Sequence, residues 1–193
     1  TSIEVKYKIE NRKIYMQVQF INDEEFIKYK FKTKPFKHQY DAFMESKDKE
    51  AYALFMEQGT GKSKVIIDNI AYLFRKGSID TVIIAAPKGV YRNWYASEFN
   101  THMPDDVVEF SKICIWSPSE TKKNVDELVD FLKESNKLRF FIINIEALST
   151  DKGKNYLHRL LNTGKSFFCI DESTTIKHRT ARRTKSVLKL GRM

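Results

Sequence analysis

Residues 1–33 alternate between apolar and polar side chains with a period of two. Three runs carry this alternation, at 3–9, 14–20 and 27–31, and a Glu10-Asn11 turn follows the first of them. Because successive side chains of a strand point to opposite faces, the pattern predicts a three-stranded antiparallel β-meander with one apolar face. That face needs a covering layer, so we expect the meander to dock against the rest of the chain.

After Pro35 the pattern changes to helices that alternate with strands. Five apolar segments predict strands, at 51–56, 81–86, 112–116, 139–145 and 166–170. The segments between them predict helices at about 38–49, 65–74, 90–100, 120–134 and 155–161. Strands that are apolar on both faces and separated by helices form a parallel sheet covered on both sides. The predicted fold class is three-layer α/β, with the meander (1–33) in front of one continuous domain (34–193).

A glycine-rich segment, Met56-Glu-Gln-Gly-Thr-Gly-Lys-Ser63, lies between an expected strand and an expected helix. Such a turn directs backbone N–H groups inward at the positive end of a helix and can hold phosphates. Lys62 is expected to reach the β- and γ-phosphates of a nucleotide, and the Ser63 hydroxyl to coordinate Mg²⁺. The strict P-loop pattern has Gly at the position of Met56, so the segment by itself also fits an ordinary turn. The expected nucleotide-binding residues of the loop are Gln58, Gly59, Thr60, Gly61, Lys62 and Ser63.

A second segment, Phe167-Phe-Cys-Ile-Asp-Glu172, places two carboxylates at the C-terminal end of an expected strand. Ligands of open α/β sheets bind at that edge. Asp171 is expected to hold the Mg²⁺ that Ser63 coordinates, and Glu172 to act as the general base on the attacking water. Glu172 and Lys62 are therefore the expected catalytic residues. The alternative is an acidic strand end stabilised by a helix dipole, but the phosphate-binding segment upstream favours the nucleotide site.

Gln39 precedes Lys62 by about 20 residues. Its amide presents a donor and an acceptor together, which matches the edge of adenine, and Phe36 is suited to pack on the base. The alternative is a solvated glutamine on a helix face. The spacing to the P-loop favours the adenine contact.

The chain carries a formal net charge of +9, which indicates a polyanionic partner, with nucleic acid the first candidate. From Ser173 to the end there is no Asp or Glu, although Lys and Arg are frequent there. This basic run is suited to line a nucleic-acid groove, and a solvated helix face is the alternative. The stripe of Lys28, Lys30 and Lys32 is interpreted as a solvated strand face.

Cys114 and Cys169 lie in apolar, strand-like runs, so we expect both to be buried, reduced thiols. Reduced thiols fit a reducing, intracellular compartment, so the expected location is the cytoplasm. No apolar run approaches the ~18–20 residues of a membrane span, and we find no secretory signal at the start. The first residue is Thr1, which suggests a processed or trimmed chain.

Together these residues resemble the first RecA-like lobe of a superfamily 2 helicase or translocase, whose P-loops commonly read AxxGxGK[ST]. Within that superfamily the chain is most similar to Swi/Snf-type translocases of duplex DNA. Segment 171–186 is similar to their DEAH-x-IKN segment, with Ile176-Lys177 at the expected place and Thr174 instead of His. Segment 84–99 looks like their motif Ia, P…NW…EF, and segment 142–148 like motif Ib, with Asn144 in place of Thr. The compact, lysine-rich character resembles phage-encoded (bacteriophage) members.

The resemblance covers about residues 35–190 and implies a monomeric motor that uses ATP and Mg²⁺ to move along double-stranded DNA. It implies that Pro87, Lys88 and Gly89 contact a phosphate backbone, and that Asn144 and Lys177 also face nucleic acid. The second RecA-like lobe lies outside the resemblance, so we expect weak ATP binding and little hydrolysis from these residues alone.

Several alternatives remain open from the sequence. They are an RNA helicase, the motor subunit of a restriction enzyme, a small-molecule P-loop kinase, and a non-catalytic module that binds nucleic acid. Trp94 also permits two interpretations, a base-stacking platform or a core residue of an amphipathic helix. The neighbouring Val90 and Phe99 favour the core.

Overall fold

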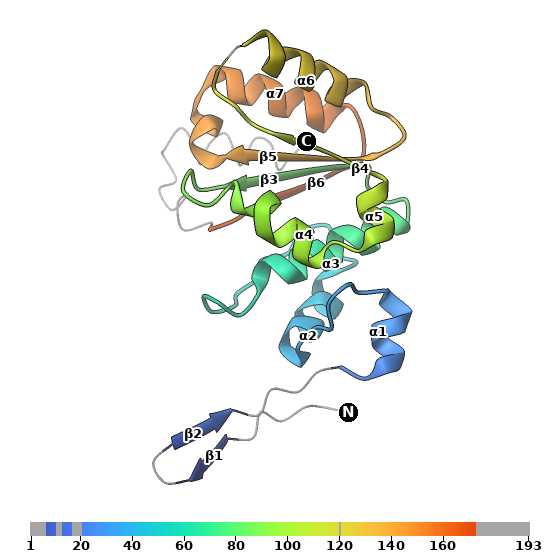
Figure 1. Ribbon diagram of the computed structural model, residues 1–193, viewed down its shortest axis with the longest axis vertical. Coiled ribbons are helices and arrows are strands. Elements are labelled where there is room, and N and C mark those ends of the chain that lie inside the picture. Colours follow the sequence, from blue (N-terminus) through green and yellow to red (C-terminus); the bar gives the residue numbers. More distant parts are fainter. Residues whose placement is uncertain (1–6, 11–12, 17–20, 120, 173–193) are drawn as a thin grey trace.

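The computed structural model describes residues 7–10, 13–16, 21–119 and 121–172. A four-stranded parallel sheet lies at its centre, in the order β4-β5-β3-β6. Helices cover both faces, with α6 and α7 on one side and α3, α4 and α5 on the other (Figure 1). The fold class is α/β with a parallel sheet, as predicted. The strands are β3 Thr81–Ala86, β4 Ser111–Ile115, β5 Leu138–Asn144 and β6 Ser166–Ile170.

The central strand β3 is fully buried, and its alternate side chains belong to different layers. Val82, Ile84 and Ala86 pack with α3 and the π-helix η1, whereas Ile83 and Ala85 pack with α6 and α7. The two sets of apolar contacts explain why this strand has no polar face: each face meets a helical layer instead of water. The helices are α1 Asp23–Tyr29, α2 Lys37–Ser46, α3 Lys62–Arg75, η1 Trp94–Phe99, α4 Asn100–His102, α5 Asp105–Glu109, α6 Lys122–Lys133, the 3₁₀ helix η2 Ile145–Ser149, and α7 Asp151–Asn162.

The first two runs of the expected meander form an antiparallel hairpin. Its strands are β1 Tyr7–Glu10 and β2 Lys13–Met16, with Ile9 opposite Ile14. This pairing confirms the hairpin part of the prediction.

The third expected strand is wrong, because this segment forms helix α1. The Asn22 side chain accepts a hydrogen bond from the Glu25 N–H at 2.8 Å and caps the helix, whose first turn is acidic. Phe26 and Tyr29, three residues apart, pack against a third apolar cluster, whereas Ile27 is 70% exposed. A strand would have put Ile27 and Tyr29 on one face. The residues of this segment that contact the core are therefore spaced as in a helix, and not at every second position as in a strand.

The segment 51–56 is also not a strand, contrary to the prediction. No strand in the described part of the chain pairs with it, and Phe55 is 97% exposed. A β-strand requires hydrogen-bonding partners for its backbone, and segment 51–56 does not join the outer edge of β6, which is an edge strand of the described sheet. The apolar sequence of a segment does not by itself specify whether a neighbouring strand pairs with it.

The other predicted elements are present with shifted ends. The helix expected at 90–100 is divided into η1 and α4, and α5 and η2 were not expected. Gly77, which follows the C-cap residue Lys76 of α3, has a φ of +69°, the left-handed conformation that commonly ends a helix. Helix α6, expected from about residue 120, begins at Lys122 and is capped by the Thr121 side chain.

Candidate nucleotide site

The glycine-rich segment forms a tight turn that leads into α3. Gly59 and Gly61 adopt φ angles of +79° and +86°, in the left-handed region that glycine tolerates best. Gly61 is the N-cap residue, and no side chain caps the first turn of α3. The N–H groups of that turn have no partner within the helix and lie at its positive end. This turn therefore has the local geometry of a phosphate-binding loop.

Lys62 extends back over the turn. Its Nζ donates to the carbonyl oxygens of Met56 at 3.0 Å and Glu57 at 2.9 Å. These carbonyls hold the ammonium group at the loop. An incoming phosphate would therefore compete with neutral acceptors for this cation.

Gln39 is buried and connects α2 to the glycine-rich turn. Its Nε2 donates to the Thr60 carbonyl at 3.0 Å, and its Oε1 accepts from the Phe36 N–H at 3.0 Å. His38 Nε2 lies 3.0 Å from the same Thr60 oxygen. The structure thus gives Gln39 a contact with the loop that the sequence reasoning missed. Its contact with adenine stays a prediction.

Asp171 and Glu172 follow β6 at the C-terminal edge of the sheet. The Asp171 N–H donates to the Ala85 carbonyl at 2.9 Å, which extends the ladder with β3 beyond the strand. The Trp94 indole Nε1–H donates to Asp171 Oδ2 at 2.9 Å. Glu172 is exposed and has a φ of +53°, a conformation that costs energy for a side chain other than glycine.

Glu98, in the π-helix η1, joins these two parts. Its carboxyl group lies near Ser63 and near Asp171. Burial raises the pKa of Glu98 above its ordinary value, the neighbouring Ser63 side chain lowers it, and the charge of Asp171 raises it. The sequence reasoning assigned Glu98 no role. The signal that could have found it is its spacing from Trp94, since residues four apart share a helix face.

The oxygen groups around Ser63 and Asp171 fit Mg²⁺. This ion takes one or two protein carboxylates and completes its shell with waters and phosphate oxygens. Among the residues that the structure describes, no group of three or more His, Cys, Asp or Glu side chains could hold a metal ion by itself. The chemistry of the donors therefore suits Mg²⁺ that is held jointly with a nucleotide.

A family model described as "Type III restriction enzyme, res subunit" matches residues 11–190. The chain belongs to this family. Membership makes it a superfamily 2 helicase-like N-terminal lobe with an ATP-binding P-loop. Among curated proteins, no sequence matches the chain significantly.

Four of the five predicted nucleic-acid residues lie along the same sheet edge as Asp171. Pro87, Lys88 and Gly89 follow β3, and the last two are exposed. Asn144 ends β5, where it is the register partner of Ala86, and its Oδ1 caps η2 by accepting from the Ala147 N–H at 2.8 Å. Lys177 lies outside the described residues. The structure brings the first four together at one edge, and their contact with nucleic acid stays a prediction.

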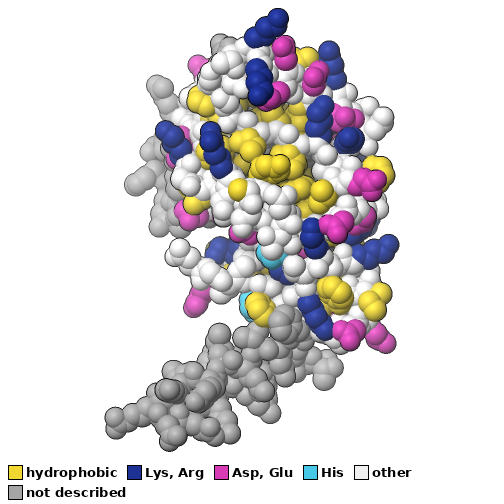
Figure 2. Space-filling model, in the orientation of Figure 1, with side chains coloured by type: hydrophobic (Ala, Val, Ile, Leu, Met, Phe, Trp, Pro, Cys, Tyr) yellow, Lys and Arg dark blue, Asp and Glu magenta, His cyan; other side chains and the backbone are white. Residues whose placement is uncertain are grey.

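The surface of the chain does not show a single basic patch on the face drawn in Figure 2, where basic and acidic side chains are interspersed. Lys32, one of the expected strand-face lysines, forms an ion pair with Asp105 at 2.7 Å. The acid-free run from Ser173 onward lies outside the described residues. Trp94 is buried in the core, so the core interpretation of its ring is confirmed.

Cys114 and Cys169 are free thiols and half-buried. Burial raises the pKa of the Cys114 thiol to about 11 and that of Cys169 to about 12, so both thiols are protonated near neutral pH. In the described parts of the chain, no helix has the length and apolar character needed to cross a membrane.

Proposed function

We propose that the chain is the ATP-binding lobe of a motor that couples ATP hydrolysis to movement along duplex DNA. The observation that carries the proposal is the connection that η1 makes to the end of β6. Trp94 of η1 donates its indole N–H to Asp171 Oδ2 at 2.9 Å, and Glu98 of the same helix lies near Ser63 at the start of α3. These contacts support a shared site for the glycine-rich turn and the strand-end carboxylates, at the sheet edge where α/β folds bind ligands.

Each side chain has a role that its position permits. Lys62 leaves the carbonyls of Met56 and Glu57 and binds the β- and γ-phosphates of ATP. Ser63 and Asp171 hold Mg²⁺, which neutralises charge on the phosphates. Glu172, exposed at the strand end, orients the attacking water and accepts its proton.

Nucleic acid binds along the same edge in this proposal. The exposed Lys88 supplies a cation and Gly89 an unhindered backbone N–H, which suits a phosphate backbone. Asn144 and Lys177 extend this surface. A second RecA-like lobe closes over the nucleotide and provides the other half of the nucleic-acid grip. Opening and closing of that cleft moves a monomeric motor along its track in the cytoplasm.

A second candidate is the motor subunit of a restriction enzyme, which the family match favours. It shares the motor chemistry and differs in delivering DNA to a nuclease. ATPase assays of the intact protein with duplex DNA, single-stranded DNA and RNA test the proposal. Stimulation by duplex DNA is expected, and stimulation by RNA alone would support an RNA helicase instead. DNA cleavage that requires ATP would favour the restriction subunit.

The catalytic assignments predict different results for two substitutions. Glu172→Gln should lower ATP turnover of the intact protein by at least about 100-fold, because the base is lost, and leave nucleotide binding unchanged. Lys62→Ala should weaken both, because the loop loses its phosphate-binding cation. Turnover and nucleotide affinity are measured for each variant.

Two exposed residues provide matched controls. Glu146→Gln changes a carboxylate near the end of β5, and Lys49→Ala removes a cation upstream of the loop. Neither should change turnover or affinity. Normal ATP hydrolysis by the Glu172→Gln variant would remove Glu172 from its assigned role.

A further inference from the structure

Two hydrogen bonds fix Asp171, the carboxylate that follows β6. Its backbone N–H donates to the Ala85 carbonyl at 2.9 Å, so the main chain of Asp171 is aligned with β3. Its side chain accepts a second bond at Oδ2 from the indole Nε1–H of Trp94, also at 2.9 Å. The first bond sets the position of the residue, and the second sets the rotation of its carboxylate. Oδ1 is then the oxygen left to face a metal ion.

The donor of the second bond is held rigidly by the protein core. Trp94 is 2% exposed and belongs to the apolar cluster between the sheet and α3. It begins η1, and Phe99 ends the same helix. Phe99 is 1% exposed and packs edge-on against Phe140 of β5 at 5.1 Å between ring centroids. Both ends of η1 are therefore anchored, and single turns of π-helix occur frequently at functional sites.

The acceptor of this bond is unusual for a core indole. A buried indole N–H needs an acceptor, because an unpaired donor costs stability, and a backbone carbonyl would meet that need equally well. The acceptor of Trp94 is instead a carboxylate at the sheet edge where α/β folds bind ligands. Hydrogen bonds to charged acceptors are shorter and stronger than those to neutral ones. The bond is therefore strong enough to determine how the Asp171 carboxylate is oriented.

We infer that Trp94 is a positioning residue that orients the Asp171 carboxylate toward Mg²⁺. The inference rests on the proposed function, because it requires Mg²⁺ bound with ATP at Asp171. Carboxylates that ligate metals are themselves hydrogen-bonded by neighbouring groups, and loss of such a partner weakens metal binding by roughly 10- to 100-fold. Trp94 itself touches neither the metal ion nor the nucleotide.

The test measures the affinity of the intact protein for a fluorescent, non-hydrolysable ATP analogue with and without Mg²⁺. Mg²⁺ should strengthen binding by the unmodified protein. Trp94→Phe keeps an aromatic ring in the core and removes the N–H. In this variant the strengthening by Mg²⁺ should fall by roughly tenfold, while the affinity without Mg²⁺ stays within about twofold. A normal Mg²⁺ effect in Trp94→Phe would overturn the inference.

Trp116→Phe is the matched control. Trp116 is 6% exposed, follows the edge strand β4 and packs on the opposite face of the sheet from Trp94. The same atoms are removed from a similarly buried indole, so a general loss of stability should appear in both variants. The Mg²⁺ effect should remain unchanged in Trp116→Phe. An equal loss of the Mg²⁺ effect in both variants would assign it to the fold and overturn the inference.

A double-substitution cycle tests whether Trp94 acts through Asp171. Asp171→Ala combined with Trp94→Phe should lose no more of the Mg²⁺ effect than Asp171→Ala alone. Additive losses would contradict the inference. Should Trp94→Phe fail to fold, benzothienylalanine at position 94 keeps the shape of the fused rings and replaces the indole N–H with sulfur. The core then stays filled while Asp171 loses its donor, and the same fall in the Mg²⁺ effect is expected.

The same measurements distinguish failure of this inference from failure of the proposed function. Lys62→Ala should weaken binding of the analogue both with and without Mg²⁺. If the unmodified protein does not bind the analogue, or binds it no better with Mg²⁺, the proposed function fails. If Mg²⁺ strengthens binding and Lys62→Ala weakens it, but Trp94→Phe keeps the full Mg²⁺ effect, only the role of Trp94 fails.

Discussion

The side-chain amide of Gln39 shows how one buried polar group shapes the nucleotide loop. It donates to the Thr60 carbonyl and accepts from the Phe36 N–H, so both of its ends have partners in the protein. A Cβ atom at Gly61 would lie 2.3 Å from Gln39 Nε2. The glycine is therefore required twice, for its positive φ and for the close approach of the amide.

Gly61→Ala should destabilise the chain more than Gly59→Ala. Both positions have positive φ, which costs an alanine about 1–2 kcal/mol, but a Cβ at Gly59 meets nothing within 4 Å. A Cβ at Gly61 would displace the Gln39 amide from its hydrogen bonds with Thr60 and Phe36, which should add about 1 kcal/mol. Urea unfolding of both variants measures the difference.

A Gln39→Ala background tests why Gly61→Ala should lower the stability more than Gly59→Ala. In this background Gly61→Ala should cost no more than Gly59→Ala, because the colliding amide is absent. An unchanged excess cost would show that the loop backbone, and not Gln39, determines the need for glycine.

The helical conformation of α1 is determined by its N-terminal cap and by its contacts with the core. Its apolar residues also fit a strand pattern, but Asn22 caps the first turn and Lys30 ends the helix in the left-handed conformation, with a φ of +52°. Phe26 and Tyr29 pack against the apolar cluster around Phe43, and this contact favours the helical form. In this segment the period-two sequence pattern favours a strand, but the tertiary contacts favour a helix, and the helix forms.

Asn22→Ala should lower the free energy of unfolding by about 1 kcal/mol, because the Glu25 N–H loses its acceptor. Asn22→Ser keeps a capping oxygen and should cost only a few tenths of that amount. Chemical denaturation monitored by circular dichroism provides the measurement. Equal stability of the alanine and serine variants would contradict the cap.

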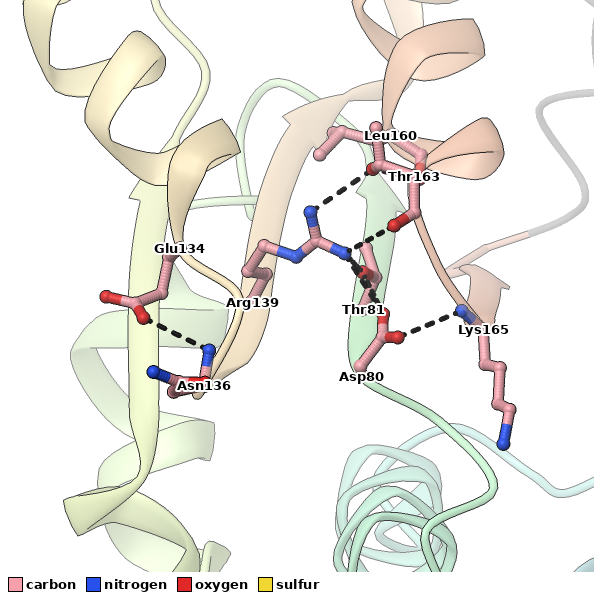
Figure 3. Close-up of polar contacts among 8 residues, drawn as sticks. All are labelled: Asp80, Thr81, Glu134, Asn136, Arg139, Leu160, Thr163 and Lys165. Carbon is pink, nitrogen blue, oxygen red and sulfur yellow. Dashed lines mark hydrogen bonds and ion pairs between the residues drawn. The ribbon is translucent and has the colours of Figure 1, made fainter.

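At the scale of the whole molecule, one end of the parallel sheet carries the candidate site and the other end carries a stabilising hydrogen-bond network. The candidate site lies at the C-terminal ends of the strands. At the N-terminal ends, Arg139 connects β5 to β3 and to the segment after α7 (Figure 3). Its Nη2 donates to Thr81 Oγ1 at 2.7 Å and Asp80 Oδ1 at 3.1 Å, and its Nη1 donates to Thr163 Oγ1 at 3.2 Å. This network holds the strands in place beneath the site.

Arg139→Met should destabilise the fold by roughly 2 kcal/mol at neutral pH, because buried hydrogen bonds are lost. The cost is no larger because Asp80 is partly exposed, so water can solvate its carboxylate when Arg139 is absent. Burial alone would raise the pKa of Asp80, but hydrogen bonds from Thr81, the Lys165 N–H and Arg139 lower it overall. A lowered carboxyl pKa stabilises the folded state above the unfolded value of 3.8. That contribution is lost as the pH falls through the folded pKa.

The difference in unfolding free energy between the unmodified chain and Arg139→Met should therefore shrink from pH 7 to about pH 3. Lys112→Met, on the neighbouring strand β4, removes an exposed contact with the Asp130 carbonyl and should cost less than about 0.5 kcal/mol at either pH. A difference that is the same at both pH values would show that Asp80 does not contribute through Arg139.

The sequence by itself determined the fold class, because apolar runs separated by amphipathic segments allow few solutions other than a covered parallel sheet. It also determined the glycine-rich turn and the strand-end carboxylates, because both depend on local backbone chemistry. Tertiary structure decided what depends on distant neighbours. It decided that segment 51–56 pairs with no strand among the described residues, that 23–29 is helical, and that Trp94 meets Asp171. These outcomes depend on which surfaces meet, and periodicity along one segment contains no information about its partner.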